Sequence, residues 1–146
     1  MQARELIEQV YICLCRQNAL YGEWARASGI SYHTIMTLYA IDQMGPCTQR
    51  RIAAEWSLSK QTVNTVVKDL ESRGYVRFTA GRDRKEKLVA FTPAGREYAG
   101  GCLRDLYQAE ERAMEQVDPA LCRAMVDGMR AYTEAFTREV RHGAQS

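Results

Sequence analysis

Six polar residues share one side of a helix that the sequence predicts near the middle of the chain. They are amide, hydroxyl and lysine side chains at Lys60, Gln61, Thr62, Asn64, Thr65 and Lys68. Gln and Asn amides can pair with adenine edges, and threonine offers bases a hydroxyl and a methyl group. Lysines at the two ends suit phosphates. This combination favours a helix that contacts bases in the major groove; a solvated polar face is the alternative.

A basic loop follows this helix, between two short apolar segments. Its cations surround Asp83 and Glu86 and are Arg82, Arg84, Lys85 and Lys87. Four positive groups on a protruding loop can follow phosphates or enter a minor groove. The alternative is a loop that its charge keeps solvated.

A third group begins a short helix just before the first one. Thr48, Gln49 and Arg50 stand at its N-terminus, where free amides and the helix dipole favour a phosphate. Ser59 and Thr48 also serve as ordinary N-caps for the two helices, and both roles can hold at once.

The charge of the chain is concentrated in the same region. Residues 47–90 contain ten basic and five acidic residues. By contrast, residues 1–46 contain three basic and four acidic residues, and residues 91–146 contain seven basic and nine acidic residues. A localised positive segment is typical of a nucleic-acid-binding surface.

Hydrophobic spacing and capping residues predict the elements that hold these groups. Apolar residues three and four apart predict six helices, near 4–27, 32–44, 49–55, 60–72, 93–117 and 119–141. Residues 75–78 and 88–91 alternate with period two, which predicts a hairpin. Gly100 and Gly101 lie inside the fifth helix, where we expect a bend or the close approach of another backbone. The order predicts a mainly α (α+β) winged helix-turn-helix.

Composition excludes several classes of protein. Five cysteines at irregular spacing and two histidines, His33 and His142, give no disulfide framework and no structural zinc site. We expect no cofactor, and neither a membrane span nor a secretory leader, and therefore a cytoplasmic protein. No catalytic triad, phosphate-binding glycine loop or paired carboxylates point to an enzyme.

The motifs together resemble the MarR family of transcriptional regulators. The matching residues are Cys47-Thr48-Gln49, Ile52, Trp56, Lys60-Gln61-Thr62-Val63-Asn64, Leu70-Glu71, Gly74-Tyr75-Val76, Asp83-Arg84-Lys85 and Phe91-Thr92-Pro93-x-Gly95. The resemblance covers essentially the whole chain, because the flanking helices also match in number and order.

The resemblance implies a homodimer on double-stranded DNA, at a pseudo-palindromic operator. It implies one domain, 1–146, with a DNA-binding winged helix at 34–92 and interlocking dimerisation helices at 4–27 and 93–141. The recognition helix would be 59–73 and the wing 77–90. The family usually has Asp-Arg-Arg in the wing, with the last Arg in the minor groove. Here Lys85 stands at that position and lacks the planar guanidinium, so minor-groove selectivity is weaker or Arg82 or Arg84 takes the role.

The resemblance also implies a signal that releases DNA, and hence a repressor. A small aromatic or organic effector would lie in a cleft for which the expected residues are Tyr21, Trp24, Tyr32, His33, Met36, Tyr39 and Trp56. The alternative within the same fold is a thiol-based redox sensor that uses Cys13 or Cys15. The alternative outside this function is a protein-binding winged helix that does not bind DNA.

Overall fold

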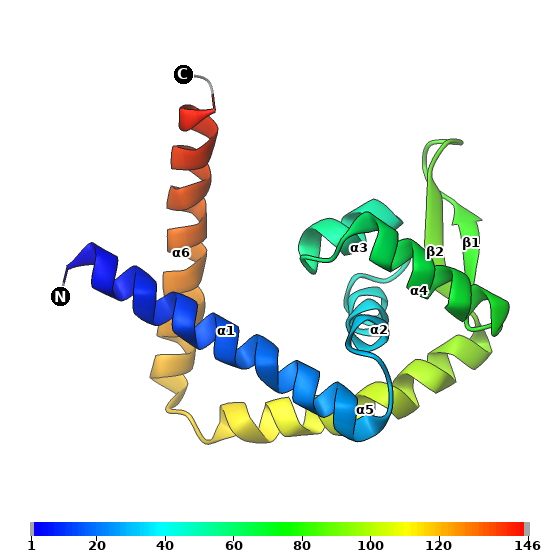
Figure 1. Ribbon diagram of the computed structural model, residues 1–146, viewed down its shortest axis with the longest axis horizontal. Coiled ribbons are helices and arrows are strands. Elements are labelled where there is room, and N and C mark those ends of the chain that lie inside the picture. Colours follow the sequence, from blue (N-terminus) through cyan, green and yellow to red (C-terminus); the bar gives the residue numbers. More distant parts are fainter. Residues whose placement is uncertain (1, 145–146) are drawn as a thin grey trace. The chain divides into compact units, whose positions relative to one another are not determined.

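The computed structural model describes residues 2–144, and this part of the chain forms six helices and a two-stranded sheet (Figure 1). In chain order the elements are α1 Ala3–Ser28, α2 Tyr32–Met44, α3 Gln49–Glu55, α4 Lys60–Ser72, β1 Val76–Ala80, β2 Lys87–Phe91, α5 Pro93–Glu115 and α6 Pro119–Gly143. The predicted mainly helical fold with a hairpin after the fourth helix is confirmed.

Hydroxyl caps fix where the three central helices begin. Ser31 Oγ accepts from the Thr34 amide at 3.1 Å, Thr48 Oγ1 from the Arg51 amide at 3.1 Å, and Ser59 Oγ from the Thr62 amide at 3.0 Å. Each cap satisfies one of the amides that a helix leaves without an internal partner. The same short side chains therefore set the starts of α2, α3 and α4.

The sheet is an antiparallel hairpin joined at its edge by the segment that precedes α3. Val76 pairs with Phe91 and Ala80 with Lys87 at the two ends of the ladder. Cys47 adds a bridge to the other edge of β2: its amide donates to the Val89 carbonyl at 3.2 Å, and the Val89 amide donates back at 2.8 Å. This bridge fixes the start of the helix-turn-helix against the base of the wing.

The hydrophobic core lies under α4. Val63, Val67 and Leu70 are 0% exposed, and they pack with α2 and α3. Ile35 and Leu38 of α2 are equally buried. Because the apolar side of α4 packs inward, its polar side must face solvent.

The chain separates into two compact units, Met1–Leu106 and Tyr107–Ser146. The first contains α1 to α4, the hairpin and the first part of α5. The second contains the rest of α5 and α6, and no residue of α6 is buried. No helix of the described residues is both long and apolar enough to span a membrane.

The close backbone approach lies at Gly95 rather than at Gly100 or Gly101. A Cβ built on Gly95 would lie 1.6 Å from the Tyr75 carbonyl oxygen, whereas one on Gly100 or Gly101 meets nothing within 4 Å in the described residues. α5 continues unbroken through both glycines. The expectation of a second backbone at Gly100 and Gly101 is therefore wrong for this subunit, because α5 docks through its first turn.

Candidate nucleic-acid interface

The outer side of α4 carries the predicted recognition residues. Lys60, Gln61, Thr65 and Lys68 are exposed, while Thr62 and Asn64 are half-buried at the edge of the apolar side. The structure therefore brings all six residues onto one exposed surface. Ser59, the cap, lies at the start of the same surface.

Some polar side chains of this surface already form local hydrogen bonds, whereas others do not. The Ser59 hydroxyl donates to Thr62 Oγ1 at 2.7 Å, and the Thr65 hydroxyl donates to the Gln61 carbonyl at 3.0 Å. Within residues 2–144 the side chain of Asn64 has no hydrogen bond. Asn64 is therefore the amide best placed to pair with a base edge, since nothing competes for its donor and acceptor.

The wing loop is held by its own backbone. Gly81 donates to the Glu86 carbonyl at 3.0 Å, and Glu86 donates to the Asp83 carbonyl at 2.9 Å. The Asp83 carboxylate also accepts from the Lys85 amide at 3.3 Å. All four predicted cations of the loop are exposed, and none forms an ion pair within the described residues: Arg82, Arg84, Lys85 and Lys87. Their positive charge is available to a partner.

The start of α3 presents one exposed cation and one that is already paired. Thr48 and Gln49 are half-buried, and Arg50 is exposed. Arg51 instead donates from Nε to Glu55 at 2.8 Å, one helical turn further on. That hydrogen bond raises the pKa of Arg51. Because Arg51 is paired with Glu55, its charge is less available to DNA than that of Arg50.

The end of α4 meets α5 in a tight joint that the sequence did not reveal. The Thr92 amide donates to the Tyr75 carbonyl at 3.0 Å, and the Thr92 hydroxyl donates to the Gly74 carbonyl at 2.6 Å. The same hydroxyl caps α5 by accepting from the Gly95 amide at 3.0 Å. The Tyr75 and Tyr98 rings stack nearly parallel across the joint, with centroids 4.1 Å apart. This joint fixes the end of α4 to the start of α5.

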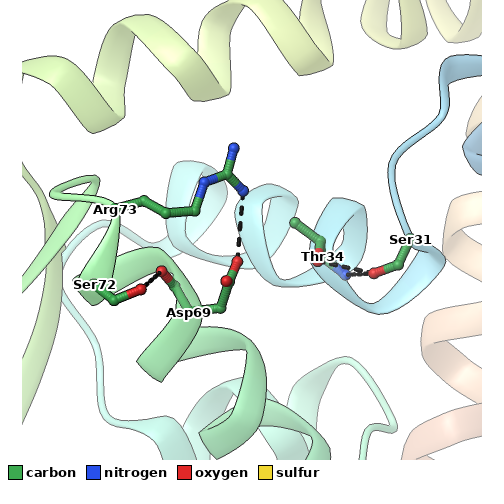
Figure 2. Close-up of polar contacts among 5 residues, drawn as sticks. All are labelled: Ser31, Thr34, Asp69, Ser72 and Arg73. Atoms are coloured by element: carbon green, nitrogen blue, oxygen red, sulfur yellow. Dashed lines mark hydrogen bonds and ion pairs between the residues drawn. The ribbon is translucent and has the colours of Figure 1, made fainter.

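Arg73, the C-cap of α4, connects this joint to the helix through its side chain. Its guanidinium lies 3.5 Å from the Asp69 carboxylate, one turn earlier, and Figure 2 shows this contact beside the cap of α2. A hydrogen bond with the Tyr98 hydroxyl is the main cause that raises the pKa of Arg73. Burial raises the pKa of Tyr98, partly offset by that bond. In the sequence this joint is marked only by the Gly74-Tyr75 pair after α4, which does not indicate that Tyr75 contacts α5.

Comparisons with known proteins agree with this geometry. Residues 28–86 match the model of the MarR family, a segment that spans α2, the helix-turn-helix and most of the wing. An uncharacterized HTH-type transcriptional regulator of Bacillus subtilis, YwoH, is 38% identical over 55 residues, which is 38% of this chain and 40% of that protein. The segment that contains the helix-turn-helix is therefore similar to the MarR family. The match covers less than half of the curated relative.

Solved MarR-family structures extend the likeness to the flanking helices. NMB1585, a MarR family regulator from Neisseria meningitidis, superposes with a TM-score of 0.76 at 22% identity and covers 98% of this chain and 99% of its own. MarR of Staphylococcus aureus, in complex with salicylate and kanamycin, superposes with a TM-score of 0.70 at 16% identity. The superposition covers 94% of this chain and 93% of the Staphylococcus aureus chain. At these identities the likeness establishes the fold alone, over nearly the whole chain.

Ring contacts join two pairs among the seven residues expected to line an effector cleft. Tyr39 contacts Trp56 with ring centroids 6.3 Å apart, and Tyr32 contacts its neighbour His33 at 5.5 Å. Among the others, Met36 is buried in the core and Tyr21 is half-buried on α1. Trp24 lines an open cleft together with residues outside this set. An effector cleft lined by these seven residues stays a prediction.

The five cysteines differ in exposure, and Cys102 and Cys122 are half-buried. Cys13 and Cys15, the predicted redox residues, are both exposed on α1. Cys47 is buried in the bridge to β2, and burial raises the pKa of its thiol. Within residues 2–144, no three side chains of histidine, cysteine, aspartate or glutamate gather into a metal-binding group. A sensor role for Cys13 or Cys15 stays a prediction.

Proposed function

We propose that this protein is a sequence-specific DNA-binding transcriptional regulator of the MarR family that acts as a homodimeric repressor. The observation that carries the proposal is the exposed side of α4. There the uncommitted amide of Asn64 lies between Lys60 and Lys68, and the wing that follows carries four unpaired cations. Amides contact bases, and the surrounding cations hold the phosphates.

A second copy of the chain is the partner that the apolar surfaces of α1 and α6 require. On α6 the exposed apolar residues include Leu121 at 63%, Phe136 at 55% and Val140 at 54%; on α1 they include Tyr11 at 67% and Leu20 at 61%. Exposed apolar surface on this scale marks an interaction site. A symmetric dimer would present two copies of α4, which suits half-sites about one helical turn apart on DNA.

The proposal includes control of DNA binding by a small-molecule effector. Its support is the likeness in fold to the Staphylococcus aureus protein, whose structure contains salicylate and kanamycin. We infer that a small organic ligand releases this protein from DNA as well. A protein-binding winged helix is the competing function, and it leaves the four unpaired wing cations without a role.

The deciding experiment is selection of bound sequences from a random duplex pool at near-physiological salt, under reducing conditions. We expect an enriched inverted repeat, because a two-fold symmetric dimer selects a two-fold symmetric site. Only salt-sensitive binding with no enriched sequence, from protein refolded free of ligand, would overturn sequence-specific regulation.

Two substitutions separate base contacts from phosphate contacts. Asn64→Ala should weaken binding to the selected site by about 1–3 kcal/mol and leave binding to random duplex unchanged. Lys85→Ala should weaken both and reduce the salt slope by about one. Fluorescence anisotropy across a salt series measures both effects. Equal losses on both duplexes for Asn64→Ala would show that α4 does not select the sequence.

Tyr132→Asp tests the dimer. Tyr132 is 40% exposed and stacks on Phe136 with centroids 5.9 Å apart, within the apolar side of α6. A charge there would be buried without a partner on association, so sedimentation should show a monomer. Arg138→Asp, on the polar side of α6, is the matched control and should stay dimeric. A dimeric Tyr132→Asp variant would place the interface elsewhere.

A further inference from the structure

An open cleft of about 610 Å³ lies where α1 ends and α5 begins. Trp24 and Ile30 line it from the α1 side, and Tyr75, Tyr98 and Cys102 line it from the joint between α4 and α5. All of its lining residues belong to the unit Met1–Leu106. The cleft shares only Trp24 with the seven residues that the sequence predicts for an effector.

The charge of the cleft has one sign. Glu97 and Asp105 both line it, and no lysine, arginine or histidine of the described residues does. Neither carboxylate has an ion pair within residues 2–144. An ionised carboxylate only accepts hydrogen bonds, so the complementary ligand must donate them or carry positive charge.

Aromatic rings form the other wall. Tyr75 and Tyr98 are stacked, and Trp24 lies on the α1 side with its indole Nε1 buried and without a hydrogen-bond partner among the described atoms. The faces of such rings are negative and attract organic cations, while their area also covers apolar groups. Rings and carboxylates therefore favour the same kind of ligand.

The Arg73 guanidinium already contacts the stacked rings of Tyr75 and Tyr98. Its guanidinium carbon lies 4.9 Å from the centroid of Tyr75 and 4.9 Å from that of Tyr98. Because the rings are parallel and stacked, a group equally far from both centroids lies beside the stack, not over an outer face. Arg73 does not line the cleft, whereas both tyrosines do. A ligand can therefore reach the rings without displacing Arg73.

We propose that this cleft binds a small organic cation, an amine or quaternary ammonium that carries an aromatic or apolar group. Glu97 and Asp105 supply the opposite charge, and Trp24, Tyr75 and Tyr98 cover the apolar part. An aromatic carboxylate would meet two like charges and is disfavoured at this site. The cleft is thus selective for ligand charge.

Binding there has a consequence for DNA through the shared tyrosines. Tyr75 and Tyr98 line the cleft and also hold the joint at which α4 ends, where Arg73 binds Tyr98. A cation stacked on these rings competes with Arg73 for their negative charge and thus alters the end of the recognition helix. This step rests on the proposed function, whereas ligand binding itself does not.

The test uses three ligands of nearly one shape and different charge, titrated into the full-length protein by calorimetry. Tryptamine is cationic, tryptophol neutral and indole-3-acetate anionic. We expect tryptamine to bind roughly tenfold more tightly than tryptophol, because each partly exposed charge contact contributes about twofold to fivefold. Indole-3-acetate should bind most weakly. Equal affinities, the reverse order or no binding of tryptamine would overturn the proposal.

Variants show whether binding occurs in this cleft. The double variant Glu97→Gln with Asp105→Asn should remove the preference for tryptamine and leave tryptophol binding unchanged. Glu111→Gln, an exposed carboxylate of α5 outside the cleft, is the matched control and should change nothing. Unchanged tryptamine affinity in the double variant would place the ligand elsewhere. These residues are exposed, so the variants should fold.

A separate measurement on the selected duplex tests the effect on DNA. Tryptamine at saturation should weaken duplex binding several-fold in the wild type and not in the double variant. Tryptamine binding without any change in duplex affinity would overturn the link through the joint and leave the ligand site standing. A protein that selects no duplex would contradict the proposed function alone, because calorimetry still reports on the cleft.

Discussion

α4 and α6 are both amphipathic helices with a polar N-cap, yet their apolar sides have opposite environments. On α4, Val63, Val67 and Leu70 are 0% exposed. On α6, Leu121 is 63% exposed and Phe136 55%, and no residue of the helix is buried. The two helices are capped alike at their N-termini, α4 by Ser59 and α6 by Asp118.

The difference separates two sources of stability. The apolar side of α4 is covered by α2 and α3 of the same unit, so its burial contributes whenever the chain folds. The apolar side of α6 has no such cover in its own unit, and in the proposed dimer it would be buried on association. Stability of the winged helix should therefore be a property of one chain, whereas α6 depends on protein concentration.

Leu70→Ala and Phe136→Ala break this comparison most directly. Leu70→Ala should lower the free energy of unfolding by about 2–5 kcal/mol, because it leaves a cavity in the core. Phe136→Ala should instead raise the dimer dissociation constant, by at least tenfold if it is a central contact. Urea denaturation measures the first effect and sedimentation equilibrium the second.

Each variant is the control for the other. Leu70→Ala should leave the dissociation constant of the folded protein unchanged, since Leu70 is fully buried within its own subunit. A Phe136→Ala variant that associates as the wild type does would show that the apolar side of α6 is not the interface, and the contrast with α4 would lose its meaning.

Gly95→Ala should be the next largest effect. The added Cβ would lie 1.6 Å from the Tyr75 oxygen, a backbone atom that cannot move away as a flexible side chain can. Separating α5 from the joint should cost about 1–3 kcal/mol in the free energy of unfolding. The same variant should disturb the stack of Tyr75 on Tyr98, which nuclear magnetic resonance of the ring protons would report.

Gly100→Ala is the matched control on the same helix. Its Cβ would meet no described atom within 4 Å, so alanine should stabilise the subunit by about 0.5–1 kcal/mol. A destabilised Gly100→Ala variant would sharpen the comparison, because it would reveal a backbone from a second copy at this point. The expectation of a close approach would then be right for the dimer.

The features that could be predicted from the sequence are those that depend on residues close together in the chain. Ser31, Thr48 and Ser59 cap helices within three residues, and the valines of α4 mark its buried side, so these features follow from local spacing. Gly95 and Tyr75 are 20 residues apart, and the approach between them depends on packing that no local pattern encodes. Within one chain the close approach therefore lies at Gly95, and no described backbone of the same chain approaches Gly100 or Gly101.

The site divides in the same way. The faces of α4 and of the wing could be predicted because each belongs to one element. Whether the expected effector residues share a cleft depends on packing between elements, and for them the structure shows only that Tyr39 contacts Trp56 and that Met36 is buried. The cleft combines Trp24 of α1 with Tyr98 of α5, 74 positions away, and only the folded chain places them together.

Ser57→Gly is the smallest expected effect, and it tests the claim that the winged helix is stable within one chain. Ser57, in the turn between α3 and α4, has a φ of 52°, a left-handed conformation that costs a residue with a Cβ about 1 kcal/mol. Glycine removes that cost and loses part of the gain to chain entropy, so a stabilisation of about 0.5 kcal/mol remains. Ser57→Ala keeps the Cβ and should give no gain, which separates backbone conformation from loss of the hydroxyl. Urea denaturation at two protein concentrations should give the same gain in each, because the turn lies in the unit that folds through its own core. A gain that appears at one concentration alone would mean that even this turn depends on the second copy, and that the winged helix is no more independent than α6.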